Sequence, residues 1–165
     1  MSDGVMVPAP AEGQGALIQR QPRGRLEPEA RALVAGFAKA NPKWDGVVVI
    51  PSDPSHWVHL SAGEVVSFQS FLTVRLASAL GAEGAVPEME QLGDTMVRPE
   101  KLAMHLRAAE LGGNRDEILG ALLGAEMAAT KVFWLGQQVV VLGEGVWADS
   151  YVEALTKQGV PVARS

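Results

Sequence analysis

Two short turns hold the residues whose types and spacing could bind a ligand. Residues 52–55 read SDPS and follow a run of β-branched residues, and residues 143–145 read GEG and follow a second apolar run. Hydroxyl and carboxylate groups can hydrogen-bond a polar ligand, and a glycine lets a ligand come close to the backbone. The same residue types also favour ordinary turns. The residues alone therefore leave both interpretations open for each turn.

The histidines and the other polar candidates add little chemistry. His56 and His59 are three apart in a predicted strand, so they face opposite ways, and His105 belongs to a separate helix. Because the chain also has no cysteine, we predict no metal site. Arg75 could bind a carboxylate or a phosphate, or could simply be solvated. Glu126 is interpreted as a partly buried polar residue rather than an acid catalyst, and no catalytic residue is identified.

A predicted strand and hairpin position the first turn. Residues 47–50 (VVVI) are typical of a strand covered on both faces. The prolines beside the turn end this strand, because proline cannot donate a ladder hydrogen bond. A hairpin follows, with its turn at residues 61–64 and its return strand at residues 65–69. Alternation along the hairpin places four apolar side chains on one inner face, namely Val58, Leu60, Val66 and Phe68.

Helices and two further strands are predicted around this hairpin. Gly120 and Gly124 lie four apart in one helix, and glycine lowers helix stability, so another element is expected to pack closely there. Residues 81–98 contain glycine, proline and acidic side chains and are interpreted as a surface crossover. The predicted helices are 28–40, 73–80, 99–111, 114–130 and 147–158, and the predicted later strands are 138–142 and 160–162.

Length and composition indicate one α/β domain. The chain has 165 residues, 47% of them hydrophobic, which suits one domain with a sizeable core. We predict this domain over residues 23–165, after a flexible N-terminal arm over residues 1–22, which are rich in Gly, Pro, Ala and Gln. A net charge of -5 without a basic cluster disfavours nucleic acid as a partner. No apolar run is long enough to span a membrane, and no signal peptide is evident, so a cytoplasmic location is expected.

The motifs, taken in order, resemble those of the 2-dehydro-3-deoxygalactonokinase family. Residues 51–58 read PSDPSHWV, where the family has PGTHSKWV after a hydrophobic strand. Residues 68–76 read FQSFLTVRL, where the family has a phenylalanine and then a Thr-x-x-Thr-Gly-Glu-Leu run. Residues 120–126 read GALLGAE, where the family has GLLIGAE in a helix. These three matches and a fourth, described next, occur in the right order, which makes the resemblance fairly specific.

The fourth match is a strand that enters the turn at Gly143, followed by Tyr151 and then Ala154-Leu155. The matches together span about residues 46–162, which correspond to the C-terminal lobe of the kinase. The resemblance implies one actin-like-ATPase (ribonuclease-H-like) lobe, in which a mixed sheet with a hairpin is flanked by helices. For the intact family it implies ATP-dependent phosphorylation of a 2-keto-3-deoxy sugar acid, with ATP and Mg²⁺ as cofactors.

The resemblance also gives the candidate site residues. The glycine turn would lie against the adenosine, and the serine-rich turn would face the phosphates. Thr73 and Arg75 match the family motif after the hairpin and are expected near the sugar acid. The residues expected to bind the cofactor are Ser52, Asp53, Ser55, Gly143, Glu144 and Gly145.

The chain also departs from the family pattern. The family's first phosphate-binding segment does not occur before residue 46. The turn after the strand lacks the family's Gly, Thr, His and Lys, and Asp53 would repel a phosphate. Val74-Arg75 replaces the family's Gly-Glu. Phosphoryl transfer depends on positioning and charge neutralisation, so we expect a truncated, degenerate kinase relative that is inactive alone and binds a nucleotide or a sugar acid weakly or not at all.

Two other hypotheses follow from the same departures. In the first, the chain is a non-catalytic interaction module, either homodimeric or paired with a separately encoded partner lobe, because a lobe that packs against another half should expose an apolar face. In the second, the chain is one part of a split kinase, and a separately encoded lobe supplies the missing part so that the two together are active.

Overall fold

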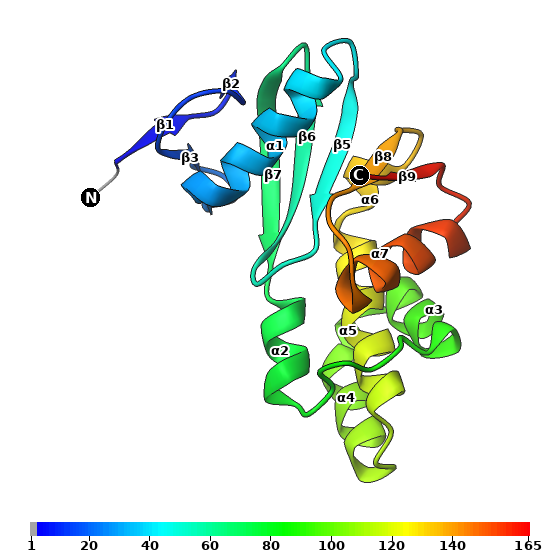
Figure 1. Ribbon diagram of the computed structural model, residues 1–165. Coiled ribbons are helices and arrows are strands. Elements are labelled where there is room, and N and C mark those ends of the chain that lie inside the picture. The colour runs from blue at the N-terminus through cyan, green and yellow to red at the C-terminus, as the bar shows by residue number, and fades with distance from the viewer. Residues whose placement is uncertain (1–2) are drawn as a thin grey trace.

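The computed structural model describes residues 3–165. These residues form a six-stranded mixed sheet, a separate three-stranded sheet and the helices that pack around them (Figure 1). In spatial order, the strands of the large sheet are β2 (Ala9–Pro10), β7 (Glu64–Phe71), β6 (Ser55–Ser61), β5 (Gly46–Ile50), β8 (Val139–Val141) and β9 (Val162–Arg164).

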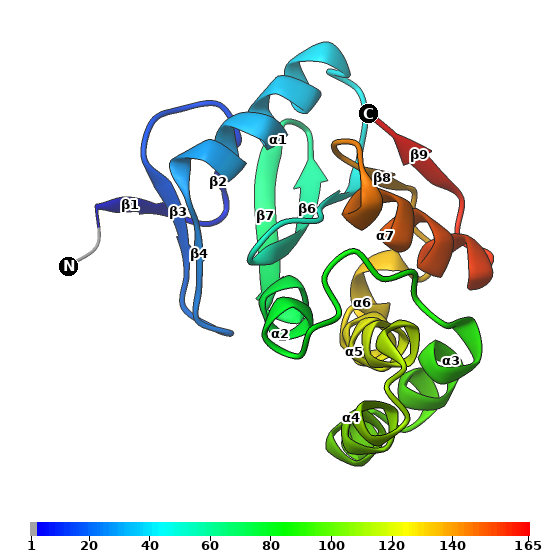
Figure 2. The same cartoon turned by 60° about the horizontal axis from the view of Figure 1, so that its bottom comes forward.

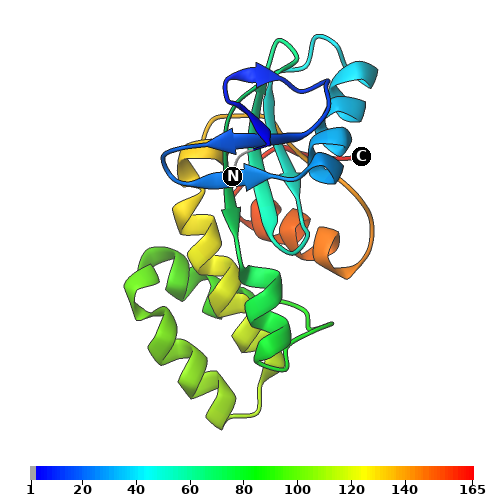
Figure 3. The ribbon, with the colours of Figure 1, turned by 90° about the vertical axis from the view of Figure 1, so that its left-hand side faces the viewer.

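Helices connect these strands and build a group beyond one end of the large sheet (Figure 3). Within residues 3–165, none of them is long and apolar enough to cross a membrane. The helices are α1 (Pro28–Ala40), α2 (Thr73–Ala79), α3 (Met89–Val97), the 3-10 turn η1 (Pro99–Lys101), α4 (Leu102–Leu111), α5 (Arg115–Ala129), α6 (Lys131–Trp134) and α7 (Val146–Lys157).

The large sheet combines an antiparallel meander with two parallel strands. β6 is antiparallel to both β5 and β7, whereas β8 lies parallel to β5 and β9 lies parallel to β8. The order β7-β6-β5-β8-β9 with these directions is that of a ribonuclease-H-like lobe. All five residues of β5 are buried, as expected for a central strand covered on both faces. The predicted fold class, a mixed sheet with a hairpin flanked by helices, is confirmed.

Helices cover both faces of the large sheet, so the lobe has two apolar layers. α1 packs on the face that carries Val48, Val58 and Phe68. α5, α6 and α7 pack on the opposite face, which carries Val47 and Trp57 (Figure 2). Opposite faces for neighbouring residues follow directly from the alternation of a strand.

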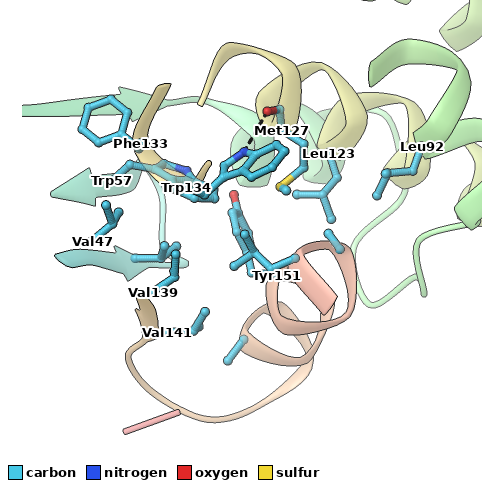
Figure 4. Close-up of a cluster of buried hydrophobic side chains, with 14 residues drawn as sticks. Val47, Trp57, Leu92, Leu123, Met127, Phe133, Trp134, Val139, Val141 and Tyr151 are labelled. Carbon is cyan, nitrogen blue, oxygen red and sulfur yellow. Dashed lines mark hydrogen bonds between the residues drawn. The ribbon is translucent and has the colours of Figure 1, made fainter. Parts of the chain in front are cut away.

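The second layer contains four buried aromatic side chains among aliphatic ones. Figure 4 shows Tyr151 of α7 extending toward Trp57 and Trp134, which places a tyrosine hydroxyl inside the core. The Trp134 indole donates a hydrogen bond of 3.0 Å to the carbonyl of Met127 in α5 (Figure 4). This bond joins α6 to α5 and satisfies an indole N–H that would otherwise be buried without a partner.

The close approach predicted at the two helical glycines is confirmed, and the neighbour is α3. A Cβ added to Gly120 would lie 2.4 Å from the carbonyl oxygen of Glu88, and one added to Gly124 would lie 2.2 Å from that of Leu92. Both distances are far below ordinary van der Waals contact, so only glycine lets α3 and α5 pack at this separation.

The interpretation of residues 81–98 as a surface crossover is wrong for residues 89–97, which form α3. The Glu88 carboxylate accepts hydrogen bonds from the backbone N–H groups of Glu90 and Gln91, which caps the start of the helix. Leu92 and Thr95 are buried against α5. Packing against α5 stabilises this nine-residue helix, which is too short to be stable alone.

A bulge in the hairpin changes which valine faces inward. The register between β6 and β7 shifts at His59 and Leu60, so Leu60 lies opposite Val65. Val65 is fully buried in the layer under α1, whereas Val66 is only partly buried. The predicted inward position of Val66 is therefore wrong, because one extra residue in a strand reverses the alternation beyond it.

The structure also differs from the flexible arm predicted for residues 1–22. Residues 1–2 lie outside the described part, and residues 3–22 contain the strands β1 (Gly4–Met6), β2 and β3 (Ala16–Gln19). β3 pairs with β1 and with β4 (Gly24–Leu26) in the three-stranded sheet, which lies beside α1 in Figure 3.

A buried arginine of α1 holds this segment in place. Arg31 is 3% exposed, and its guanidinium donates from all three nitrogens to backbone carbonyls of the segment. Such bonds satisfy carbonyls that have no partner in a strand. The composition rich in Gly and Pro could not reveal this long-range partner. The accepting carbonyls are those of Pro10, Ala11, Glu12, Gln14 and Gly15.

Candidate functional site

The candidate ligand-binding residues all lie at one edge of the large sheet. β5, β7 and β8 run in the same direction, so their carboxyl ends meet at this edge. The turn at residues 51–54 follows β5, α2 follows β7, and the turn at residues 142–145 follows β8. Ligands of α/β sheets bind outside the carboxyl ends of parallel strands. The fold thus brings together positions 52–55, 73–75 and 143–145 as the motifs require.

In the first turn, an aspartate is paired with an arginine from α2. The Nε of Arg75 donates to both carboxylate oxygens of Asp53, at 3.1 and 3.2 Å, and both side chains are exposed. The Ser52 hydroxyl donates to the Pro54 carbonyl at 2.7 Å, within the turn. The pair has no net charge, so the turn presents neither the strong repulsion expected of an isolated aspartate nor a free cation. An exposed pair of this kind contributes little to stability.

In the second turn, two glycines hold conformations that other residues rarely adopt. Gly143 has a φ of 94° and Gly145 a φ of 99°, and open space lies where each Cβ would be. The Gly143 N–H donates to the carbonyl of Ser165 at 2.7 Å, which fixes the turn to the end of the chain. Gly145 is the N-cap of α7 and supplies no side-chain cap. The first N–H groups of α7 are therefore left free of a capping side chain beside open space.

Arg164 also contacts this turn, and no sequence motif selected it. Its guanidinium donates to the Gly143 carbonyl at 3.3 Å and to the Asp149 carboxylate at 2.5 Å. These contacts follow from β9 pairing with β8, because this pairing brings Arg164 opposite Val141 at the end of β8. An arginine paired with an aspartate therefore lies beside the glycine turn.

Glu126 of α5 connects the elements that carry both turns. Its carboxylate accepts hydrogen bonds from the Ser55 hydroxyl at 2.9 Å and from the Trp57 indole at 3.0 Å. Thr73 of α2 and Tyr151 of α7 lie close to the same carboxylate. The Tyr151 hydroxyl makes no bond of standard geometry, so we regard its contact with Glu126 as weaker than those of Ser55 and Trp57.

Burial dominates the titration of this cluster. Glu126 is 3% exposed, and the loss of solvation raises the pKa of its carboxyl, although hydrogen bonds from its neighbours oppose the shift. Loss of solvation, and then the adjacent Glu126 charge, raise the pKa of Tyr151 well above its usual range. Glu126 is more deeply buried than the partly buried residue the sequence predicted. Ser55 hydrogen-bonds to Glu126 and Thr73 lies close to it. The side chains of Ser55 and Thr73 are therefore directed into the core and support the site without facing a ligand.

The histidines do not form a metal site. His56 is buried, and its Nδ1 lies 2.7 Å from the Ser70 hydroxyl. Burial lowers the pKa of His56 to about 4, although the charge of Glu27 opposes the shift. His59 lies on the opposite face of the same strand. Within residues 3–165, no three His, Asp or Glu side chains are grouped so that they could hold a metal ion.

Two comparisons with known proteins point to the same kinase family. The sequence model of the 2-keto-3-deoxy-galactonokinase family matches residues 95–165. A crystal structure from Sinorhizobium meliloti, provisionally assigned as a 2-dehydro-3-deoxygalactonokinase, is similar to this chain with a TM-score of 0.84. The alignment covers 98% of this chain and 68% of that chain at 21% identity, and at this identity it shows the fold. No curated protein sequence matches the chain. The resemblance to the 2-dehydro-3-deoxygalactonokinase family is confirmed.

Proposed function

We propose that this chain is the nucleotide-binding lobe of a kinase that resembles 2-dehydro-3-deoxygalactonokinase. The observation that carries the proposal is the position of two separate turns and the start of α2 at one sheet edge, joined underneath by Glu126. The family match over residues 95–165 includes Glu126 and the glycine turn, which supports the proposal independently.

In this proposal the adenosine lies against residues 143–145, where positive φ angles leave open space above the backbone. The phosphates then extend toward the uncapped start of α7 and toward Arg75, because backbone N–H groups and arginine both bind phosphate oxygens. Asp53 competes for Arg75 and weakens this contact. Affinity for the phosphates is accordingly expected to be low.

The residues present do not provide a complete site for phosphoryl transfer. Mg²⁺, if it were bound with ATP, would neutralise phosphate charge. Asp53 is already paired with Arg75, and Glu144 is the other carboxylate in the two turns. This set suits an ion carried in by the nucleotide better than one held by the protein alone. Within residues 3–165 we identify no general base at this edge, so we propose that the chain needs a further lobe to phosphorylate a sugar acid.

Calorimetry with ATP, with and without Mg²⁺, tests this proposal. We expect weak saturable binding that is lost in Gly145→Val, because a branched side chain at a φ of 99° both distorts the turn and fills the open space. Gly113→Val is the matched control, since Gly113 also has a positive φ, 63°, but lies in the turn between α4 and α5. No binding by the unmodified chain, or equal loss in both variants, would contradict the proposal.

The exposed side of α2 favours a second candidate function, a protein-interaction module. Leu72, Leu76 and Leu80 are each at least 40% exposed and follow one another at a spacing of four. Such an apolar stripe next to the candidate site suits a contact with a second copy or with a separately encoded partner lobe. A molar mass from light scattering separates the two functions. A strict monomer that binds ATP would favour the nucleotide-binding lobe, and a dimer disrupted by Leu76→Glu would favour the module.

A further inference from the structure

A cavity of about 320 Å³ opens on the same face of the sheet as α6, away from the glycine and serine turns. Three distant segments line it: the tip of the β3–β4 hairpin, the middle of β6 and β7, and the end of α6. Val47, the second residue of β5, is part of its floor. The serine turn begins after Ile50, about 10 Å further along the same strand. The cavity is therefore separate from the proposed nucleotide site.

The lining of the cavity is polar but carries no formal charge. It includes four glutamines, a serine and a histidine, and within residues 3–165 it includes no Asp, Glu, Lys or Arg. Neutral amides and hydroxyls can each donate and accept hydrogen bonds. The six polar side chains are Gln19, Gln21, His59, Ser67, Gln69 and Gln137.

One of these glutamines holds the wall of the cavity rigid, and the others are left available. The Gln19 side-chain amide donates to the Phe68 carbonyl at 2.7 Å and accepts from the Phe68 N–H at 2.8 Å, so it acts as a strand partner for β7. A further bond to the Pro22 carbonyl, at 3.1 Å, fixes the hairpin tip. In the described part of the chain, the structure records no side-chain hydrogen bond for Gln69 or Gln137.

Apolar surface completes the cavity. Val132 and Phe133 of α6 form one side, and Pro22 of the hairpin tip forms another. Small-molecule sites commonly combine apolar walls with a few convergent polar groups, at volumes of about 300 to 1,000 Å³. At the lower end of this range, the ligand is of monosaccharide size.

From this lining we infer that the cavity binds a neutral, polyhydroxylated molecule of monosaccharide size. Hydroxyl groups that both donate and accept match amides that do the same, and the carbon face of a sugar ring matches the valine, proline and phenylalanine. A carboxylate or a phosphate is disfavoured, because its charge would lose hydration without meeting a cation. The site thus differs in ligand class from a sugar-acid acceptor site, and it does not depend on the proposed nucleotide binding.

Amide chemical-shift titration of the whole chain tests this inference. D-galactose, added to tens of millimolar, serves as the neutral probe, and D-galactonate serves as a charged probe with the same number of carbons. We expect saturable shifts at residues 67–69 and 132–137 with galactose and smaller shifts there with galactonate. Gln137 is exposed, so Gln137→Leu should remain folded and weaken galactose binding by about fivefold, which corresponds to the loss of one net hydrogen bond.

Gln158→Leu is the control, since it removes the same amide from the end of α7, outside the cavity lining. It should leave galactose binding unchanged. Three results would overturn the inference: no saturable shift with galactose, equal or tighter binding of galactonate, or shifts centred on residues 143–145. Each can be recognised whether or not the chain binds ATP, because no nucleotide is present in the titration.

Discussion

Substitution of Gly124 by alanine tests most sharply how α5, which carries Glu126, is positioned. The new Cβ would lie 2.2 Å from the Leu92 carbonyl oxygen and 2.2 Å from the Thr95 hydroxyl oxygen, whereas ordinary contact begins at 3.4 Å. The threonine side chain could turn away, but the carbonyl belongs to the backbone of α3. The two helices would therefore have to separate by roughly 1 Å at this point.

The expected loss of stability can be estimated from two opposing effects. Overpacking of a core costs about 1–3 kcal/mol. Alanine in a helix is favoured over glycine by about 1 kcal/mol. Because the clash is with backbone, we place the overpacking at the upper end and predict that Gly124→Ala lowers the free energy of unfolding by about 2 kcal/mol.

Urea unfolding followed by circular dichroism measures this loss. Gly93→Ala in α3 is the matched control, since nothing lies within 4 Å of its added Cβ and only the gain in helix propensity remains. It should stabilise the protein by about 0.5–1 kcal/mol. If Gly124→Ala were as stable as the original chain, the close packing of α3 on α5 would be refuted.

Three further changes test the buried polar groups. Arg31→Lys should lower the free energy of unfolding by at least about 2 kcal/mol in urea unfolding, because lysine cannot reach all five carbonyls, while the exposed Arg23→Lys should be neutral. Burial lowers the pKa of His56 from 6.5 to about 4, which corresponds to up to about 3 kcal/mol of folding stability that is present above pH 6.5 and lost as the pH falls toward 4. His56→Gln should remove this pH dependence of the unfolding free energy, and an unchanged slope would contradict it. Burial raises the pKa of Glu126, so its contribution to folding stability is present below pH 4.5 and is lost as the pH rises. The stability of Glu126→Gln relative to the original chain should therefore increase with pH above 4.5. A difference in unfolding free energy that stays constant with pH would rule out the raised pKa.

Local patterns in the sequence predicted the parts of the fold that local chemistry determines. The β-branched run at residues 47–50 predicted the buried strand β5, and Pro28 marked the start of α1. The pair of glycines in α5 predicted a close neighbour, although it could not identify α3 as that neighbour. These features depend on side chains a few positions apart, which a sequence displays directly.

Features that depend on distant contacts could not be predicted in the same way. Arg31 lies about twenty positions from the carbonyls it bonds, and Glu126 lies 71 positions from Ser55. No pattern in the sequence near either residue predicts its hydrogen-bond partners. The bulge at His59 also arises from pairing between strands. For the candidate site, the matched motifs lie at one edge of the sheet, but the ion pair of Asp53 with Arg75 appeared only in three dimensions.

The central claim is that the two turns form one nucleotide site, and an amide chemical-shift map with ATP tests it most directly. We predict that one saturating titration shifts the amides of Ser52, Asp53 and Ser55 together with those of residues 73–75 and 143–146, with a single dissociation constant. Shifts at one turn alone, or only in other parts of the chain, would contradict the account.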